Sequence, residues 1–387
     1  QKLLKEGLAY PDPYTEEELS AFREKAEKEK KPFLFRNHRP VAFKEWDGKV
    51  PLRFKVPVVK RYAWEDAVRG NLEAGEEALD DFVLLKADGY PTYNFAHIID
   101  DHEMGVTHVF RGDEFISSTP RFLSVYEALD FERPVFATTP PILRGDRTKK
   151  LGKRDGAKDI LEYREEGYLP EAMMNFLALI GWHPGNDQEL FTEQELLIAF
   201  SLDQIQKSGG AFDEAKLRWF NREHILRLSA ERFISYAKDF LSEQTTRALS
   251  QAGVFESLVP LMRERIQTFG ELRDMDAAGE FSFYAEAPEY DATGLLYKGD
   301  PDPKATAERL KKLYVILQNV PESQWHDKTI KDLVWPLTEK EGRGEVLWPF
   351  RYALSGKEKS PDPFTIAGII GKNETHHRLE KAVSVLT

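Results

Sequence analysis

Cationic side chains crowd into one short stretch of a chain that is acidic as a whole. The 387 residues carry a formal net charge of −12, whereas residues 143–158 hold seven Lys or Arg against two Asp, a local balance of +5. The seven are Arg144, Arg147, Lys149, Lys150, Lys153, Arg154 and Lys158. Glycines within the same stretch let the backbone approach a ligand closely. Lysine point charges and accessible backbone amides together suit a polyphosphate.

Three further polar side chains, Tyr93, His97 and Arg111, precede this loop. Tyr93 and His97 are four residues apart, so on a helix they share one face. Residues 106–110 are rich in β-branched and aromatic side chains and predict a strand. That strand places Arg111 at its carboxyl end, which is the edge where open α/β sheets bind ligands.

Two helices are predicted around these residues. After the turn signal Asp88-Gly89, apolar residues recur with helical spacing at Phe95, Ile98 and Ile99. The run Ser118-Thr119-Pro120 predicts a helix start with hydroxyl caps and proline in the first turn. We therefore expect a helix, a strand and a second helix to hold Tyr93, His97 and Arg111.

Several ordered runs of the chain resemble bacterial-type glutamyl-tRNA synthetases, which are class I aminoacyl-tRNA synthetases. Lys150-Leu151-Gly152-Lys153-Arg154 is similar to the second signature loop of that class. Asp88-Gly89-Tyr90-Pro91-Thr92-Tyr93 and Arg111-Gly112-Asp113-Glu114 are similar to the family's glutamate pocket. Similarity continues through Gly181-Trp182-His183-Pro184-Gly185 and beyond, so it covers most of the chain.

The resemblance implies a two-step reaction on L-glutamate. ATP converts its α-carboxylate to glutamyl-adenylate, and the glutamyl group then passes to the 3′ end of tRNA-Glu. Arg111 is expected to pair bidentately with the side-chain carboxylate of glutamate, which its planar fork fits better than a neutral amide. Tyr93 is expected to hydrogen-bond the substrate, and His97 to line the pocket.

The signature loop is implied to bind ATP through Lys150, Leu151, Gly152, Lys153 and Arg154. Lys153, helped by Lys150, is expected to stabilise negative charge on the phosphates during transfer. Gly152 stands where the family usually has serine, which removes one hydroxyl and leaves Lys153 as the main group. Mg²⁺ is expected to arrive with ATP and not at a protein metal site.

The resemblance also implies the partners. Arg351 matches an arginine that meets the anticodon in the family, and tRNA-Gln is a possible second substrate beside tRNA-Glu. We expect a monomer. The first signature of the class, H-x-G-H, does not occur in the sequence. Since the family places it in an amino-terminal half-domain and this chain starts at Gln1, we expect roughly the first half of the nucleotide fold to be missing.

The expected architecture is α/β plus all-α. Residues 1–80 would form an insertion that binds the tRNA acceptor end, with a charged helix at 16–31 and a strand-like run at 52–59. Residues 81–140 would form the second half of a Rossmann-type catalytic domain, in which 82–86 returns the chain to the central sheet. Residues 141–235 would hold the signature loop and stem contacts, and 236–387 a helical anticodon-binding domain.

Composition sets limits on the function. With 41% hydrophobic and 31% charged residues and no long apolar run, the sequence indicates a globular protein of the cytoplasm without membrane contact. The absence of cysteine excludes disulfides and thiolate zinc sites, so no zinc is expected. A charge of −12 argues against nonspecific nucleic-acid coating, but local basic patches still allow tRNA binding.

Alternatives remain from the residues themselves. Asp100, Asp101, His102, Asp113 and Glu114 could bind the metal of a phosphoesterase. The chain could be a non-catalytic tRNA-binding module, or a glutaminyl-tRNA synthetase, although those enzymes carry β-barrels where this sequence is helical. Without a family, Arg111 could form a structural ion pair with Asp113 and Glu114, the cationic loop could simply be solvated, and Arg351 could be a helix-end charge.

Overall fold

The computed structural model describes residues 1–152, 154 and 158–387 and divides into two compact units. The first unit comprises Gln1–Gly156 and Leu177–Asp213, and the second comprises Ala157–Phe176 and Glu214–Thr387. All strands that the structure describes end by Thr139, so they belong to the first unit. Along the parts of the chain that are described, no helix combines the length and the apolar character needed to cross a bilayer.

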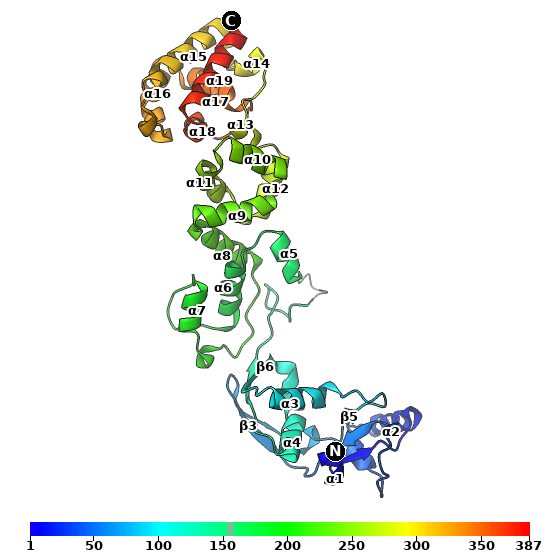
Figure 1. Ribbon diagram of the computed structural model, residues 1–387. Helices are drawn as coiled ribbons and strands as arrows, with labels where there is room; N and C mark the ends of the chain where they lie inside the picture. The colour runs from blue at the N-terminus through cyan, green and yellow to red at the C-terminus, as the bar shows by residue number, and fades with distance from the viewer. Residues whose placement is uncertain (153, 155–157) are drawn as a thin grey trace. The chain divides into compact units, whose positions relative to one another are not determined.

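A four-stranded sheet forms the centre of the first unit (Figure 1). Its strand order is β4 (Gly70–Ala74), β3 (Tyr62–Asp66), β7 (Val135–Thr139) and β6 (His108–Gly112). β3 and β4 are antiparallel, whereas β7 runs parallel to both β3 and β6. The predicted strand is confirmed, and it places Arg111 opposite Thr138 near the carboxyl ends of the parallel pair.

The two predicted helices are α3 (Tyr93–Glu103) and α4 (Thr119–Leu129), which pack against each other. Their apolar faces join the sheet in one core that includes Ile98, Phe122 and Phe136. The expected hydroxyl cap of Ser118 is wrong, because its side chain makes no capping hydrogen bond. Residues Asp113–Ser118 already form a 3-10 helix, η3, and the Thr119 hydroxyl donates to the Phe115 carbonyl at 2.9 Å.

A second, three-stranded sheet has the order β1 (Ala9–Pro11), β2 (Leu52–Phe54) and β5 (Val83–Leu85). The expectation that residues 82–86 rejoin the central sheet is therefore wrong. β5 is a strand, but it pairs antiparallel with β2. All three residues of β2 are buried, and Leu52, Phe54 and Leu84 share a core. The alternation of side chains along β5 predicts a strand, but it does not indicate which strand pairs with it.

The remaining elements of the first unit are short. The charged run at 16–31 forms α2 (Glu16–Lys28), which begins with a capping box between Thr15 and Glu18. The bounds of the others are α1 (Lys2–Lys5), η1 (Phe35–His38), η2 (Glu76–Ala78), α7 (Glu193–Ala199) and η5 (Leu202–Gln204). The boundary between the two units falls within α6 (Pro170–Gly181).

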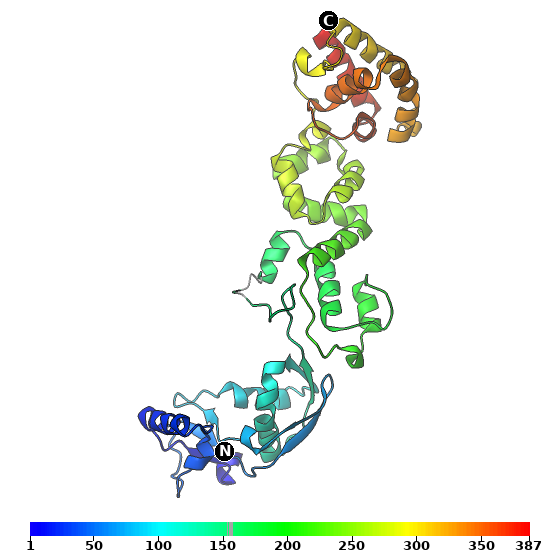
Figure 2. The ribbon, with the colours of Figure 1, turned by 180° about the vertical axis from the view of Figure 1, so that it is seen from behind.

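The second unit is helical, as expected for the carboxyl-terminal part of the chain (Figure 2). Beside η6 (Glu322–Gln324) and α6, its helices are α5 (Ile160–Glu165), α8 (Glu214–Arg227), α9 (Ala230–Phe240), α10 (Glu243–Gln251), α11 (Phe255–Arg265), α12 (Gly270–Ala277), α13 (Ser282–Ala285), α14 (Ala292–Leu295), α15 (Pro303–Gln318), α16 (Asp327–Glu341), α17 (Arg343–Ser355), α18 (Pro363–Ile370) and α19 (Lys372–Leu386). The apolar faces of α15 and α19 are buried in one core, through Leu310, Leu313 and Leu379 among others.

One buried arginine ties three of these helices together. Arg378 on α19 is only 1% exposed. It donates to the carbonyl oxygens of Phe283 (2.6 Å) and Leu354 (2.5 Å) and pairs with Glu374 at 2.8 Å. Since these partners come from α13, α17 and α19, the guanidinium satisfies the ends of helices that would otherwise leave buried carbonyls without donors.

We predict that Arg378→Met lowers the free energy of unfolding of the helical unit by about 3 kcal/mol, because it leaves buried acceptors unsatisfied. The measurement is hydrogen exchange of α13, α17 and α19 amides in urea. Arg247→Met is the matched control, since Arg247 forms an i,i+4 pair with Glu243 at 67% and 88% side-chain exposure. That control should change stability by less than about 0.5 kcal/mol. Equal effects of the two substitutions would contradict the assignment.

Candidate active site

Arg111 lies at the carboxyl end of β6 among aromatic rings. Its guanidinium carbon is 5.1 Å from the ring centres of both Phe122 and Phe136 and 5.6 Å from that of Phe115. These rings come from α4, β7 and η3, the elements that surround the end of the strand. Burial lowers the pKa of Arg111, since an apolar setting disfavours its charge.

Among the residues that the structure describes, no carboxylate is paired with Arg111. Its buried Nε and Nη1 atoms have no hydrogen-bond partner among the described residues. The two neighbouring acids are engaged elsewhere, Asp113 with Arg69 at 3.8 Å and Glu114 with Lys150 at 3.5 Å. The alternative of a structural ion pair is therefore wrong. A buried, unpaired guanidinium is costly, and this arrangement fits an external anion.

The structure brings His97 and Tyr93 to the same place. The ring of His97 meets Phe122 edge-on at 4.5 Å and stacks on Tyr93 at 4.8 Å. Tyr93 remains 57% exposed. Burial, together with the charge of Arg111, lowers the pKa of His97, so its ring is neutral near pH 7. The three residues predicted to bind the substrate thus form one cluster around Phe122.

Sequence reasoning missed a fourth member of this cluster, Tyr126 on α4. The residue is 1% exposed, and its hydroxyl has no hydrogen-bond partner among the described residues. Burial raises the pKa of Tyr126 to about 12, and the charge of Arg111 acts on it in the opposite direction. Tyr126 shares a buried face of α4 with Phe122, Val125 and Leu129. A hydroxyl on a face that is otherwise apolar was the available signal.

The signature loop begins as a β-hairpin. Leu143 and Lys150 form an antiparallel bridge, and the Leu151 amide donates to the Ile142 carbonyl at 2.8 Å. Asp146 shapes the turn by accepting hydrogen bonds from the amide (3.0 Å) and hydroxyl (2.8 Å) of Thr148. The hairpin thus fixes the backbone of Lys150 and Leu151.

Burial differs among the signature residues that the structure describes. Lys150 and Arg154 are exposed, whereas Leu151 and Gly152 are half-buried. Lys153, the residue predicted to be catalytic, lies outside the described residues. Lys150 reaches Glu114 on η3, three residues beyond Arg111, so this lysine lies near the substrate-binding cluster.

Close backbone contacts fix the base of the hairpin. The Leu143 amide donates to the Gly210 carbonyl, and the Phe212 amide donates to the Leu143 carbonyl, both at 2.9 Å. A Cβ atom on Gly210 would lie 2.1 Å from the Ile180 carbonyl oxygen. Only glycine allows this approach, so Gly210 determines where the hairpin sits in the first unit.

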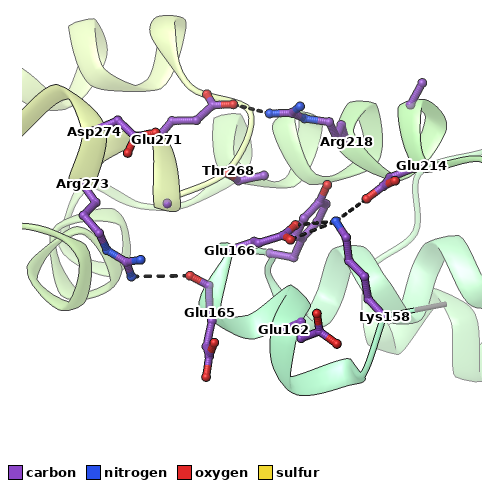
Figure 3. A pocket seen from close by; sticks show the side chains of 13 residues that line it. Lys158, Glu162, Glu165, Glu166, Glu214, Arg218, Thr268, Glu271, Arg273 and Asp274 are labelled. Atoms are coloured by element: carbon purple, nitrogen blue, oxygen red, sulfur yellow. Dashed lines mark hydrogen bonds and ion pairs between the residues drawn. The ribbon is translucent and has the colours of Figure 1, made fainter. Parts of the chain in front are cut away.

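After the loop, the chain is anchored within the helical unit by Lys158 (Figure 3). Its Nζ lies 2.9 Å from a Glu166 oxygen and 2.5 Å from a Glu214 oxygen. Burial disfavours the charge of Lys158, but the two carboxylates outweigh burial and raise its pKa. Asp159 then starts α5 with a capping box that includes Glu162. The loop exit is thus held by charge pairing and by a helix cap.

These residues line a cleft of about 770 Å³. Its walls come from α5, α8 and α12, where Arg218 pairs with Glu271 at 2.5 Å. α12 approaches closely, since a Cβ on Gly270 would lie 2.6 Å from the Glu166 carbonyl oxygen. Six carboxylates and three cations line the cleft: Glu162, Glu165, Glu166, Glu214, Glu271 and Asp274 against Lys158, Arg218 and Arg273. This surplus of negative charge does not suit a phosphate.

Arg351 lies on α17. One of its Nη atoms donates to the Glu358 carbonyl at 2.8 Å, and its guanidinium lies 5.1 Å from the ring centre of Trp348. Its Nε is buried without a partner in the described residues. The arginine is thus oriented by its neighbours but keeps unused donor capacity.

The metal-site alternative finds no support. Within the ranges that the structure describes, no group of three or more His, Asp or Glu could hold a metal ion. Asp113 and Glu114, two of the proposed ligands, instead pair with Arg69 and Lys150. The geometry therefore does not favour a metal-dependent phosphoesterase.

The comparisons with known proteins agree with this geometry. Residues 1–219 match the model of the catalytic domain of class I tRNA synthetases (E and Q), and residues 230–383 match an anticodon binding domain. The chain belongs to the class I glutamyl- and glutaminyl-tRNA synthetase family. The recognised resemblance and the α/β plus all-α fold class are confirmed.

Relatives of this synthetase family span the whole chain. Glutamate–tRNA ligases of Clostridium botulinum and Clostridium kluyveri are each 34% identical, over 398 and 403 residues, which is all of this chain and 79% of theirs. A crystal structure of a glutamate tRNA ligase from Elizabethkingia meningosepticum, in complex with its amino acid, has a TM-score of 0.76 at 30% identity. That similarity covers 100% of this chain and 81% of the other.

The Lys158 anchor leads to a stability prediction. Lys158→Met should destabilise the helical unit by about 1–2 kcal/mol, because it removes charged hydrogen bonds and leaves Glu166 and Glu214 to repel each other. Hydrogen exchange of α5 and α8 amides measures the loss. Lys381→Met is the matched control, since Lys381 pairs with a Glu289 side chain that is 90% exposed. Its cost should stay below about 1 kcal/mol; α5 and α8 exchange unchanged by Lys158→Met would refute the anchor.

Proposed function

We infer that this protein is a glutamate–tRNA ligase, which attaches L-glutamate to tRNA at the expense of ATP. The relatives that cover the whole chain are named for that activity. The second unit is helical, which supports a glutamyl-tRNA synthetase over a glutaminyl-tRNA synthetase, because the latter was expected to carry a β-barrel there. The anticodon-binding match argues that the chain serves tRNA recognition as part of an enzyme.

The observation that carries this inference is the unpaired guanidinium of Arg111. A carboxylate offers two oxygens to two parallel N–H donors, whereas an amide offers only one. Nε and Nη1 are both buried in an apolar setting, where a charged hydrogen bond is strong, and each of them forms a parallel donor pair with Nη2. We assign the side-chain carboxylate of glutamate to Arg111, with Tyr93, His97 and Tyr126 around it.

ATP is assigned to the cationic hairpin. Lys150, Leu151, Gly152, Lys153 and Arg154 form its binding segment in this proposal, and Mg²⁺ arrives with the nucleotide. Lys150 is paired with Glu114 at side-chain exposures of 61% and 54%, so a phosphate can compete for it. Lys153 and Lys150 then hold the negative charge that develops during transfer.

The tRNA is assigned to the helical unit through Arg351, whose guanidinium is oriented by the Glu358 carbonyl and suits a base edge or a phosphate. We propose tRNA-Glu as the partner, with tRNA-Gln as a possible second substrate. The protein is proposed to act as a monomer in the cytoplasm. The predicted division at residues 80, 140 and 235 is retained as part of this proposal.

Arg111→Met tests the glutamate site. Glutamate affinity should fall at least about 30-fold, since the substitution leaves the carboxylate without its charged partner. ATP affinity should be unchanged. Isothermal titration calorimetry measures both, and Arg133→Met is the matched control, because Arg133 pairs with Glu127 on α4 and has no role in the cluster. If ATP affinity falls while glutamate affinity holds, the pocket is misplaced.

A tRNA binding series tests the second unit. We predict stronger binding of tRNA-Glu, alone or together with tRNA-Gln, than of an unrelated tRNA across a salt series. Arg351→Ala should reduce that preference, whereas Arg247→Ala, an exposed arginine on α10, should leave it unchanged. Equal weak binding of all three tRNAs, lost as salt rises, would mean that these helices do not read anticodons.

A further inference from the structure

The tautomer of His97 is fixed by its hydrogen bond. Nδ1 lies 2.7 Å from the carbonyl oxygen of Tyr93, one turn back on α3. A carbonyl oxygen can only accept, so Nδ1 carries the proton. The neutral ring therefore presents a lone pair at Nε2. This atom is buried and has no hydrogen-bond partner in the described part of the chain.

The groups around His97 oppose a positive charge on it in the free protein. Burial and the nearby guanidinium of Arg111 from β6 lower the pKa of His97. The hydrogen bond to Tyr93 and the weaker effects of Asp101 and Asp100, all on α3, act in the opposite direction. α4 contributes the Tyr126 hydroxyl, which is un-ionised because burial raises its pKa, and β5 contributes Val83, Leu84 and Leu85.

A neutral His97 does not match the ligand assigned to Arg111. A carboxylate has only acceptor oxygens, so the Nε2 lone pair has nothing to accept from it. Protonated Nε2 would donate instead. The arriving carboxylate also neutralises the charge of Arg111, which removes one of the effects that kept His97 neutral. The same atom that repels the substrate when neutral would hold it when protonated.

We propose that glutamate binding at Arg111 is accompanied by uptake of one proton from solvent onto Nε2 of His97. The inference rests on the proposed function, since it takes glutamate as the ligand. The protonated imidazole becomes a second donor to the side-chain carboxylate. Glutamine behaves differently, because its amide N–H₂ can donate to the neutral Nε2 and requires no proton. Selectivity for glutamate over glutamine thus depends on pH.

The direction of the pH effect follows from linkage. Below the pKa of His97 in the free protein, the ring is already charged, and glutamate affinity is highest and constant. Between the free and the higher bound pKa, one proton is taken up, and affinity falls by up to about tenfold per pH unit. Above the bound pKa, affinity is constant again and weak. Glutamine affinity stays level across the same range.

The experiment is calorimetric titration of the protein with glutamate and with glutamine from pH 5.5 to 8.5. Each pH is measured in two buffers whose ionisation enthalpies differ, so the difference in apparent heat reports the protons bound. We expect glutamate to take up close to one proton in the middle of its window and glutamine to take up none. The ratio of their affinities should fall about tenfold or more as pH rises.

Two variants and one direct readout isolate His97. His97→Asn should abolish the proton uptake and flatten the glutamate profile. His224→Asn is the matched control, since His224 is also buried with a lowered pKa, but its Nε2 already meets Asn175 at 3.1 Å. That control should retain the uptake. In the unaltered protein, ¹⁵N-imidazole spectra should show Nε2 of His97 gaining a proton when glutamate is added, independently of how the variants fold.

The outcomes separate the two proposals. Glutamate binding without proton uptake, or uptake that persists in His97→Asn, overturns the role of His97 and leaves the proposed function intact. An absence of glutamate binding at every pH overturns the assignment of glutamate to Arg111, and the proton coupling with it. Uptake that is lost in His97→Asn and retained in His224→Asn supports both.

Discussion

A guanidinium held among aromatic rings, with no acid paired to it in the described part of the chain, is the constraint on which the first unit depends. Removing Arg111 from water costs several kcal/mol, and nothing that the structure describes offsets that cost by pairing. The surrounding framework must therefore be rigid enough to keep it buried. Asp66 provides part of that rigidity, because it accepts from the Thr138 amide at 3.0 Å and its hydroxyl at 2.6 Å and so holds β7 to β3.

Arg111 and Arg378 differ in how their guanidinium donors are used. Burial lowers the pKa of both guanidiniums. Arg378 donates hydrogen bonds to two carbonyls and pairs with Glu374, and all three partners lie within the helical unit. Among the described residues, Nε and Nη1 of Arg111 have no partner. Stability alone would favour an apolar residue at a buried position without partners, which is why we propose a ligand for Arg111.

Much of the site could be read from local patterns. Helical spacing and strand composition located α3, β6 and α4, and with them the positions of Tyr93, His97 and Arg111. These predictions succeeded because each depends on residues close in sequence. The pairing of β5 with β2 and the Lys158 anchor were not predicted, because each is decided by partners far along the chain, such as Glu214 for Lys158.

The failed capping prediction has a related cause. Ser118 has the residue type of a helix cap, but Asp113–Ser118 is already a 3-10 helix, so α4 does not begin from an extended residue. A cap requires that its residue lie outside the helix, and type alone does not reveal this.

The distribution of charge reconciles an acidic chain with an anionic nucleotide and a polyanionic partner. Long-range repulsion from a net charge of −12 disfavours indiscriminate contact with nucleic acid. Attraction then exists only where cations gather locally, as in residues 143–154, which hold six Lys or Arg against one Asp. The carboxylate-lined cleft around Lys158 repels phosphates, so its charges are available for holding α5, α8 and α12 together. The acidic residues gather where α5, α8 and α12 meet, and the basic residues gather in a loop. One acidic protein can therefore hold these helices together and still attract an anion.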